Sequence, residues 1–127
     1  MIYGAILAGG IGKRLGFTTP KQFVKINNKP ILLYSIEKFL EIDEFDKIII
    51  TAPSQCLEYT KYIISNFFGD NEKLVIIEGG KEHNDSILNS IYYLKENNCL
   101  KDSILVTHDA DRMFVTADLI KYAIWCG

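Results

Sequence analysis

Four short apolar segments rich in β-branched residues constrain the fold of this chain more than any other feature. They span residues 2–7, 47–51, 74–77 and 103–107. Each is uniformly apolar instead of alternating, which is typical of strands buried on both faces of a sheet. Segments with helical spacing of apolar residues follow at 32–40, 57–67, 87–92 and 119–124. Strands that alternate with helices predict an α/β fold with a doubly wound, mostly parallel, Rossmann-like sheet.

Several residues mark the expected helix starts. Pro30 suits a first turn, and Ser54 and Thr116 are candidate N-caps. Asp118 puts negative charge near a helix N-terminus. Ligands of doubly wound sheets bind outside the carboxyl ends of the strands. The residues that follow each strand are therefore where we expect the functional site.

Composition limits the class of protein. The chain has 127 residues, 48% hydrophobic and 24% charged, which predicts one globular domain over residues 1–127 whose core needs no disulfide or metal. The net charge is -2 and no block of basic residues occurs, so nucleic acid is not an expected partner. No apolar run reaches the roughly 18 residues of a membrane span. The scattered Cys56, Cys99 and Cys126 indicate reduced thiols and a cytoplasmic location.

A glycine-rich segment with two cations follows the first expected strand. It contains Gly9, Gly10, Gly12, Lys13, Arg14 and Gly16. Glycines let backbone N–H groups approach a phosphate chain, and the cations neutralise its charge. Arg14 replaces the Ser or Thr of a P-loop, and Leu15 replaces the third glycine of the dinucleotide fingerprint. The segment therefore predicts a phosphate cradle of another type, with a glycine-rich turn that binds nothing as the alternative.

Two further segments carry candidate binding groups. Lys21 follows Pro20, which stiffens the backbone and directs the ammonium group, although a solvated surface lysine is the simpler interpretation. The segment between the third strand and its helix includes Gly79, Gly80 and Ser86. Free amides and a hydroxyl near a helix N-terminus suit a base edge or a phosphate. A turn with an N-cap from Asn84 or Ser86 explains the polar residues equally well.

Two carboxylates, Asp109 and Asp111, follow the fourth strand. Hard oxygen ligands suit Mg²⁺, and we expect Asp109 to bind it. A carboxylate that caps the next turn or pairs with Arg112 is the alternative. For His108 we favour a packed or hydrogen-bonded imidazole over a metal ligand. A cationic glycine loop, a glycine pair and an acidic strand end on one sheet edge together predict a nucleoside triphosphate with magnesium.

Four motifs occur in order along the chain: Leu-Ala-Gly-Gly-x-Gly-x-Arg-Leu-Gly, Pro-Lys-Gln-Phe, Gly-Gly-x-x-x-x-x-Ser-Ile and His-Asp-Ala-x-Arg. With them the sequence resembles the polyol-phosphate cytidylyltransferase family, which comprises ribitol-5-phosphate cytidylyltransferase and 2-C-methyl-D-erythritol 4-phosphate cytidylyltransferase. The resemblance implies Mg²⁺-dependent transfer of CMP from CTP to a phosphorylated polyol, with release of pyrophosphate. Pro-Lys-Gln-Phe and Val-Thr-His-Asp look more like the ribitol 5-phosphate branch.

The same resemblance implies roles for individual residues. Arg14 and Lys21 would hold the phosphates of CTP and stabilise charge on the α-phosphoryl group in flight, and Asp109 would bind Mg²⁺. The backbone positions that would wrap CTP are Ala8, Gly9, Gly10 and Gly12. The residues that would meet the cytosine are Gly80 and Ser86, and those that would lie by the ribose or brace the loop are Ala110 and Arg112.

The resemblance also has departures. The family usually has Arg at the position of His83, a small residue at Asp111 and Pro at Met113. It extends only over the amino-terminal, nucleotide-binding half of the family, whose later portion supplies a further metal-binding acid, a catalytic lysine and a dimerising arm. We expect either part of a longer enzyme or a shortened homologue, and a non-catalytic nucleotide-binding protein is the second hypothesis. A sugar-nucleotide glycosyltransferase is the third, because Asp109 and Asp111 have D-x-D spacing.

Overall fold

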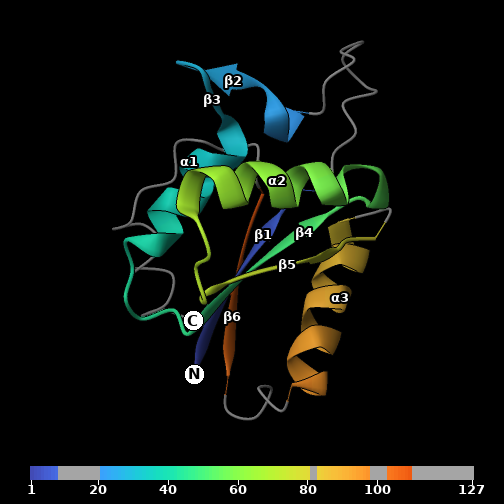
Figure 1. Ribbon diagram of the computed structural model, residues 1–127. Coiled ribbons are helices and arrows are strands. Elements are labelled where there is room, and N and C mark those ends of the chain that lie inside the picture. Colours follow the sequence, from blue (N-terminus) through green and yellow to red (C-terminus); the bar gives the residue numbers. More distant parts are fainter. Residues whose placement is uncertain (9–20, 81–82, 98–102, 110–127) are drawn as a thin grey trace.

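A parallel sheet of four strands forms the centre of the molecule. The computed structural model describes residues 1–8, 21–80, 83–97 and 103–109, without the side chains of residues 21, 83 and 84 (Figure 1). The strands are β1 (Ile2–Leu7), β4 (Lys47–Ala52), β5 (Leu74–Glu78) and β6 (Ile104–Asp109). They lie in the order β5-β4-β1-β6, and each pairing is parallel. The predicted strands and the predicted parallel sheet are confirmed.

Helices cover both faces of this sheet (Figure 1). One face carries α1 (Ile31–Leu40) and α2 (Leu57–Phe68), and the other carries α3 (His83–Glu96). The first face includes Ile6, Ile48, Ile50, Leu32, Ile36, Phe39 and Ile64. The second includes Tyr3, Ile49 and Leu94. Successive side chains of a strand point to opposite faces, so the odd-numbered residues of β1 and β4 face α3 and the even-numbered ones face α1 and α2.

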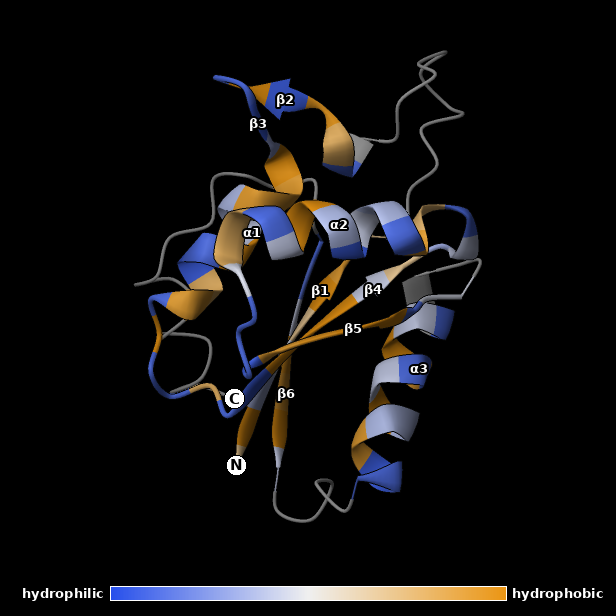
Figure 2. Ribbon diagram, in the orientation of Figure 1, coloured by the Kyte–Doolittle hydropathy of each residue, from blue (hydrophilic) through white to orange (hydrophobic). Residues whose placement is uncertain are grey.

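Burial differs between the inner and the outer strands. In β1 and β4, five of the six residues of each are buried, as their uniform hydrophobicity in the sequence predicts. In β5 and β6, which are the outer strands of the described sheet, the residues are half-buried or exposed. In Figure 2 the strands are mostly apolar, and α3 is hydrophilic on the side that faces away from the sheet. The expectation of strands buried on both faces thus holds for the central pair only.

Gly4 lets α1 approach β1 closely. A Cβ atom at this position would lie 2.8 Å from Cδ2 of Phe39 and 3.3 Å from Cε1 of Phe45. These two rings stack with their centroids 5.1 Å apart. Because a contact under 3 Å forces a shift of its neighbours, the aromatic pair fits against the sheet only where a side chain is missing.

A two-stranded hairpin precedes α1 and was not predicted. A 3₁₀ turn, η2 (Lys21–Phe23), leads into β2 (Lys25–Ile26) and β3 (Lys29–Pro30), which pair antiparallel. Asn27 and Asn28 at the turn both have positive φ, 54° and 65°. Asparagine tolerates this left-handed conformation, which the tight turns of hairpins require. Strands of two residues are too short to show a hydrophobic period.

Lys29 attaches this hairpin to the helices. Its Nζ lies 4.4 Å from the ring centroid of Tyr34 and 4.6 Å from that of Phe67, and it forms an ion pair with Glu37. The hydroxyl of Tyr34 donates to the carbonyl oxygen of Ile26 at 2.7 Å. Lys29 and Tyr34 therefore attach the hairpin to α1 and to the end of α2.

The helix starts differ from those predicted at two places. Ser54 is not the N-cap of the following α-helix: it begins a 3₁₀ turn, η3 (Ser54–Cys56), and Cys56 occupies the cap position of α2 without a side-chain hydrogen bond. Pro30 occupies the cap position of α1, one residue before the first turn. Thr116, Asp118 and the expected helix at 119–124 lie outside the described residues.

Cys56 is a free thiol, as predicted, and burial raises its pKa, which keeps the thiol protonated. Cys99 and Cys126 lie outside the described residues. None of the described helices combines the length and the hydrophobicity that crossing a membrane requires.

Candidate functional site

The carboxyl ends of the strands meet at one edge of the sheet. Leu7, the last residue of β1, pairs with Thr51 of β4 on one side and with Asp109 of β6 on the other. The backbone N–H of Ala8 continues the β1–β4 ladder and donates to the carbonyl oxygen of Thr51 at 2.9 Å. Strand β6 ends two residues later than expected, so Asp109 is its last residue. Ala8 and Asp109 thus lie at the ends of adjacent strands.

The strand order reverses between β1 and β6. From β1 the chain proceeds outward to β4 and then to β5, and it returns to the other side of β1 with β6. Adjacent loops leave opposite faces of the sheet at such a switch point, which opens a crevice for ligands at the carboxyl ends of the strands. The glycine-rich segment starts at one side of this point, after Ala8, and Asp109 ends the strand at the other side.

Asp109 and His108 lie on opposite faces of the sheet. Asp109 shares the α3 face with Leu105, whereas His108 pairs with Ile6 on the α1 face. Nε2 of His108 lies 3.4 Å from the hydroxyl of Ser35, and its ring lies 5.8 Å from that of Phe39 between centroids. The prediction of a packed, hydrogen-bonded imidazole is confirmed, and His108 does not share the side of the sheet that Asp109 occupies.

Gly79 and Gly80 follow β5 and pack closely against the start of α3. The N–H of Gly79 donates to the carbonyl oxygen of Ala52 at 2.7 Å, and the N–H of Gly80 donates to Oγ of Ser86 at 3.2 Å. A Cβ atom at Gly79 would lie 2.7 Å from Oγ of Ser86, and one at Gly80 would lie 2.0 Å from Cβ of Asp85. Neither glycine has a positive φ, so close approach of neighbouring atoms is what requires glycine at both positions.

Ser86 lies within the first turn of α3 and accepts the hydrogen bond from Gly80. It is 2% exposed, and its carbonyl oxygen accepts a hydrogen bond from the hydroxyl of Ser90 at 3.0 Å. It is not the N-cap, because α3 begins three residues earlier at His83. A serine hydroxyl that accepts one hydrogen bond can still donate its own hydrogen. The structure thus brings Gly80 and Ser86, which were both predicted as base-binding residues, into direct contact.

Two residues of this edge, Thr51 and Gln22, were not predicted from the sequence motifs. The hydroxyl of Thr51 is fully buried beside Gly79 and has no hydrogen-bond partner among the described residues. Gln22 is 2% exposed, and its Nε2 donates to the carbonyl oxygen of Ala8 at 3.1 Å. The available signals were a polar residue at the end of an apolar strand and an amide inside the Pro-Lys-Gln-Phe motif.

The sequence matches the IspD family, 2-C-methyl-D-erythritol 4-phosphate cytidylyltransferase, over residues 2–125. The chain belongs to this family. Its members use CTP, which agrees with the nucleotide expected from the four motifs. The family match includes the residues on both sides of the switch point.

Solved structures of IspD enzymes have the same fold. The 4-diphosphocytidyl-2C-methyl-D-erythritol synthase of Anaerococcus prevotii superposes with a TM-score of 0.78 at 18% identity, over 99% of this chain and 50% of that one. A second synthase of that name has a TM-score of 0.78 at 16% identity, over 98% and 52% of the two chains. The bifunctional IspDF of Campylobacter jejuni has a TM-score of 0.72 at 24% identity, over 98% and 30%. This chain spans about half the length of the two synthases.

The expected site residues divide into two groups. Those with a described position at the sheet edge are Ala8, Gly80, Ser86 and Asp109, together with the backbone of Lys21 in η2. Those outside the described residues are Gly9, Gly10, Gly12, Arg14, Ala110 and Arg112, and also Asp111 and Met113. Within the first group, Gly80 and Asp109 are separated by three strand spacings, roughly 14 Å, which suits an extended ligand across the edge.

The described donor set for a metal is small. No group of three or more His, Cys, Asp or Glu side chains comes together within the described part of the chain. Mg²⁺ differs from zinc in this respect, because it keeps several waters and is held by one or two carboxylates together with substrate phosphates. A single carboxylate at Asp109, which pairs in register with Leu7 at the carboxyl end of β1, fits that mode of binding.

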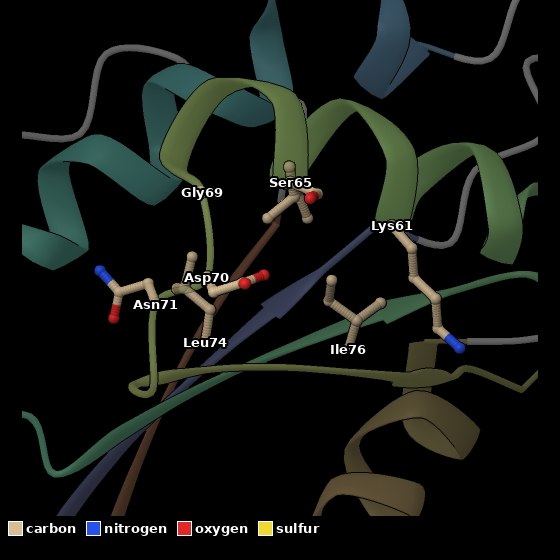
Figure 3. Close-up of a pocket in the computed structure, with 8 residues that line it drawn as sticks. Lys61, Ser65, Gly69, Asp70, Asn71, Leu74 and Ile76 are labelled. Atoms are coloured by element: carbon tan, nitrogen blue, oxygen red, sulfur yellow. The ribbon is translucent and has the colours of Figure 1, made fainter.

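A pocket of about 230 Å³ lies elsewhere, between α2 and β5 (Figure 3). Its lining residues are Lys61, Ile64, Ser65, Gly69, Asp70, Asn71, Leu74 and Ile76. Leu74 is the first residue of β5, and residues 69–71 belong to the loop that leads into this strand. The pocket is thus on the side of the amino end of β5, away from the turn at Gly79 and Gly80.

Proposed function

We propose that this chain provides the CTP-binding part of an enzyme that transfers CMP from CTP to a phosphorylated polyol. An oxygen of the polyol phosphate attacks the α-phosphorus in line and forms the new P–O bond. The bond from the α-phosphorus to the bridging oxygen breaks, and pyrophosphate leaves. Such a reaction depends mainly on positioning and on stabilisation of charge. The observation that carries the proposal is the position of Ala8 and Asp109 on the two sides of the switch point in an IspD-family chain.

Each group of residues has a distinct part in the proposal. Arg14 and Lys21 hold the phosphates and stabilise the charge that develops on the α-phosphoryl group. Asp109 holds Mg²⁺, which would neutralise phosphate charge when bound. The backbone that wraps the triphosphate is that of Ala8, Gly9, Gly10 and Gly12. The residues assigned to the cytosine are Gly80 and Ser86, and those assigned to the ribose are Ala110 and Arg112. The hydrogen bond between Gly80 and Ser86 uses the N–H of Gly80, which was expected to be free, and leaves the hydroxyl hydrogen of Ser86 to donate to the base.

The acceptor we propose is 2-C-methyl-D-erythritol 4-phosphate. The family match supports this choice over ribitol 5-phosphate, which the motifs Pro-Lys-Gln-Phe and Val-Thr-His-Asp favour. Ribitol 5-phosphate therefore stays as the alternative acceptor. Reduced thiols in the sequence support a cytoplasmic setting, and a dimer is expected from the family resemblance.

Thermal unfolding tests the nucleotide. The chain is unfolded with Mg²⁺ and, in turn, CTP, UTP, ATP and GTP, because a ligand at about 100 times its dissociation constant stabilises the folded state by roughly 2.7 kcal/mol. We expect stabilisation by CTP alone. Stabilisation by another nucleotide in preference to CTP, or by none, contradicts the proposal. A stronger effect of nucleotide sugars would favour the glycosyltransferase hypothesis.

Release of pyrophosphate tests the reaction. CTP and Mg²⁺ are incubated with the full-length enzyme of which this chain is the proposed CTP-binding part, and with either polyol phosphate. We expect pyrophosphate in the presence of 2-C-methyl-D-erythritol 4-phosphate. Release with ribitol 5-phosphate instead would establish the alternative acceptor. Binding of CTP without release of pyrophosphate in the presence of either polyol phosphate would support a nucleotide-binding protein without catalytic activity.

A further inference from the structure

A buried amide links the start of the glycine-rich segment to the residue after Lys21. Nε2 of Gln22 donates to the carbonyl oxygen of Ala8 at 3.1 Å, and the side chain of Gln22 is 2% exposed. The N–H of Ala8 donates to the carbonyl oxygen of Thr51 at 2.9 Å. Both polar backbone groups of Ala8 are therefore satisfied by the protein, one by the sheet and one by η2.

An apolar side chain would fill the same space more simply. Burying a glutamine orders several rotatable bonds and removes an amide from water, which is favourable only when its hydrogen bonds are made. The carbonyl oxygen of Ala8 lies where the pairing of β1 with β4 ends. The side-chain amide of Gln22 thus supplies the hydrogen bond that a neighbouring strand would otherwise donate to the carbonyl oxygen of Ala8.

Two candidate phosphate-binding elements meet at this hydrogen bond. One is the glycine-rich segment, which begins directly after Ala8, and the other is Lys21, whose Cα lies one peptide unit, about 3.8 Å, from that of Gln22. Ala8 and Lys21, the described residues on either side of positions 9–20, are therefore linked through the side chain of Gln22. This hydrogen bond fixes the backbone of Ala8 relative to that of Lys21 before a ligand binds, which lowers the entropic cost of binding.

We infer that Gln22 is a positioning residue, which fixes the backbone of Lys21 relative to Ala8 so that Lys21 is aligned for the phosphates of the nucleotide. The inference rests on the proposed function, because it assumes that these elements bind phosphate. Gln22 acts through Ala8 and Lys21 near the end of β1. Gly80 and Ser86 lie after β5, which β4 separates from β1. Loss of the amide should therefore affect the triphosphate and leave the binding of the base unchanged.

The experiment compares CTP with cytidine, which lacks the phosphates. Dissociation constants of both are measured by titration calorimetry with Mg²⁺ for the wild-type chain and for Gln22→Met, which keeps the length of the side chain and removes the donor. We expect Gln22→Met to weaken CTP binding by about tenfold while cytidine binding changes less than about twofold. Gln22→His, whose ring N–H can donate, should recover part of the CTP affinity.

Two variants serve as controls. Nδ2 of Asn97 donates to the carbonyl oxygen of Tyr93 at 2.8 Å, which is the same type of hydrogen bond at an exposed position at the end of α3. Asn97→Ala should leave both dissociation constants unchanged. Ser86→Ala removes a proposed base contact and should weaken CTP and cytidine by the same factor.

The possible results separate the two claims. A wild-type chain that binds no CTP refutes the proposed function and this inference with it. If the wild type binds CTP and Gln22→Met weakens CTP and cytidine equally, only the inference is refuted. The same holds if Gln22→Met weakens neither. If Gln22→Met does not fold, the side-chain NH₂ resonance of Gln22 in the wild type is followed by NMR. A shift with CTP that cytidine does not produce supports the inference, and no shift with CTP overturns it.

Discussion

His108 and Asp109 are consecutive in β6 and face opposite sides of the sheet. His108 contacts Ser35 and Phe39 on the side of α1, whereas Asp109 lies on the side of α3 at the end of the strand beside Leu7. The pleat of a strand separates the two side chains although the sequence joins them. They should therefore respond to mutation in different ways, one through nucleotide binding and the other through stability.

Asp109→Asn should remove the part of the CTP affinity that depends on Mg²⁺. A neutral amide keeps the shape of the carboxylate and loses its charge, so we expect at least about a tenfold weaker CTP binding in the presence of Mg²⁺. Binding without the metal should change little, and the melting temperature should stay close to that of the wild type. Calorimetry with and without Mg²⁺ measures the difference. An equal loss of affinity in both conditions would contradict the role of Asp109 as a ligand.

His108→Ala should lower stability and leave nucleotide binding unchanged. The variant removes the contact with the hydroxyl of Ser35 and the packing against Phe39, which together are worth about 1–2 kcal/mol of unfolding free energy. Denaturation with urea measures this loss. A weaker affinity for CTP in the folded variant would show that the imidazole belongs to the site after all.

Gly80→Ala should disturb both the turn and the start of α3. The added Cβ would lie 2.0 Å from Cβ of Asp85, so the helix must shift. We expect a loss of about 1–3 kcal/mol in unfolding free energy and weaker binding of both CTP and cytidine. Gly69→Ala is the matched control, because Gly69 has a φ of +68° with nothing within 4 Å of the new atom. With ψ at −156° this is a conformation that only glycine normally adopts, so a cost of about 1–3 kcal/mol comes from backbone strain alone, and the affinity for CTP should equal that of the wild type.

Thr51→Val should stabilise the protein. The hydroxyl of Thr51 is fully buried without a partner among the described residues, and valine replaces it with a methyl group of similar shape. An unpaired buried hydroxyl costs about 1–3 kcal/mol, so we expect a gain of about 1 kcal/mol after relaxation. The midpoint of urea denaturation should rise. A loss of stability would indicate that the hydroxyl is hydrogen-bonded in solution, for example to a buried water.

The sheet and its helices could be predicted because their signals are local. Uniformly apolar runs of five or six residues mark β1 and β4, and a helical period marks α1, α2 and α3. The hairpin at 25–30 gives no such signal, since its strands have two residues each. Ser54 was wrongly predicted as an N-cap because its sequence context does not distinguish a 3₁₀ turn from the first turn of an α-helix.

The candidate site could be predicted only in part. Asp109, Gly80 and Ser86 follow directly from their places after strands, and the structure brings the last two together. Gln22 and Thr51 depend on contacts with Ala8 and Gly79, which are distant in sequence. No local pattern reports such a pairing, because it exists only once the sheet has formed.

The setting of Lys29 also determines how the hairpin responds to salt. Its side chain is 17% exposed and lies between two aromatic rings, whereas the pairs Lys38–Glu41 and Lys61–Glu58 are at least 41% exposed at each partner. Dissolved ions screen exposed charges over roughly 8 Å at physiological strength and reach enclosed ones far less. The contacts of Lys29 should therefore persist at salt concentrations that screen the exposed ion pairs of α1 and α2. The hairpin, and residues 22–24 before it, should then stay attached to the helices.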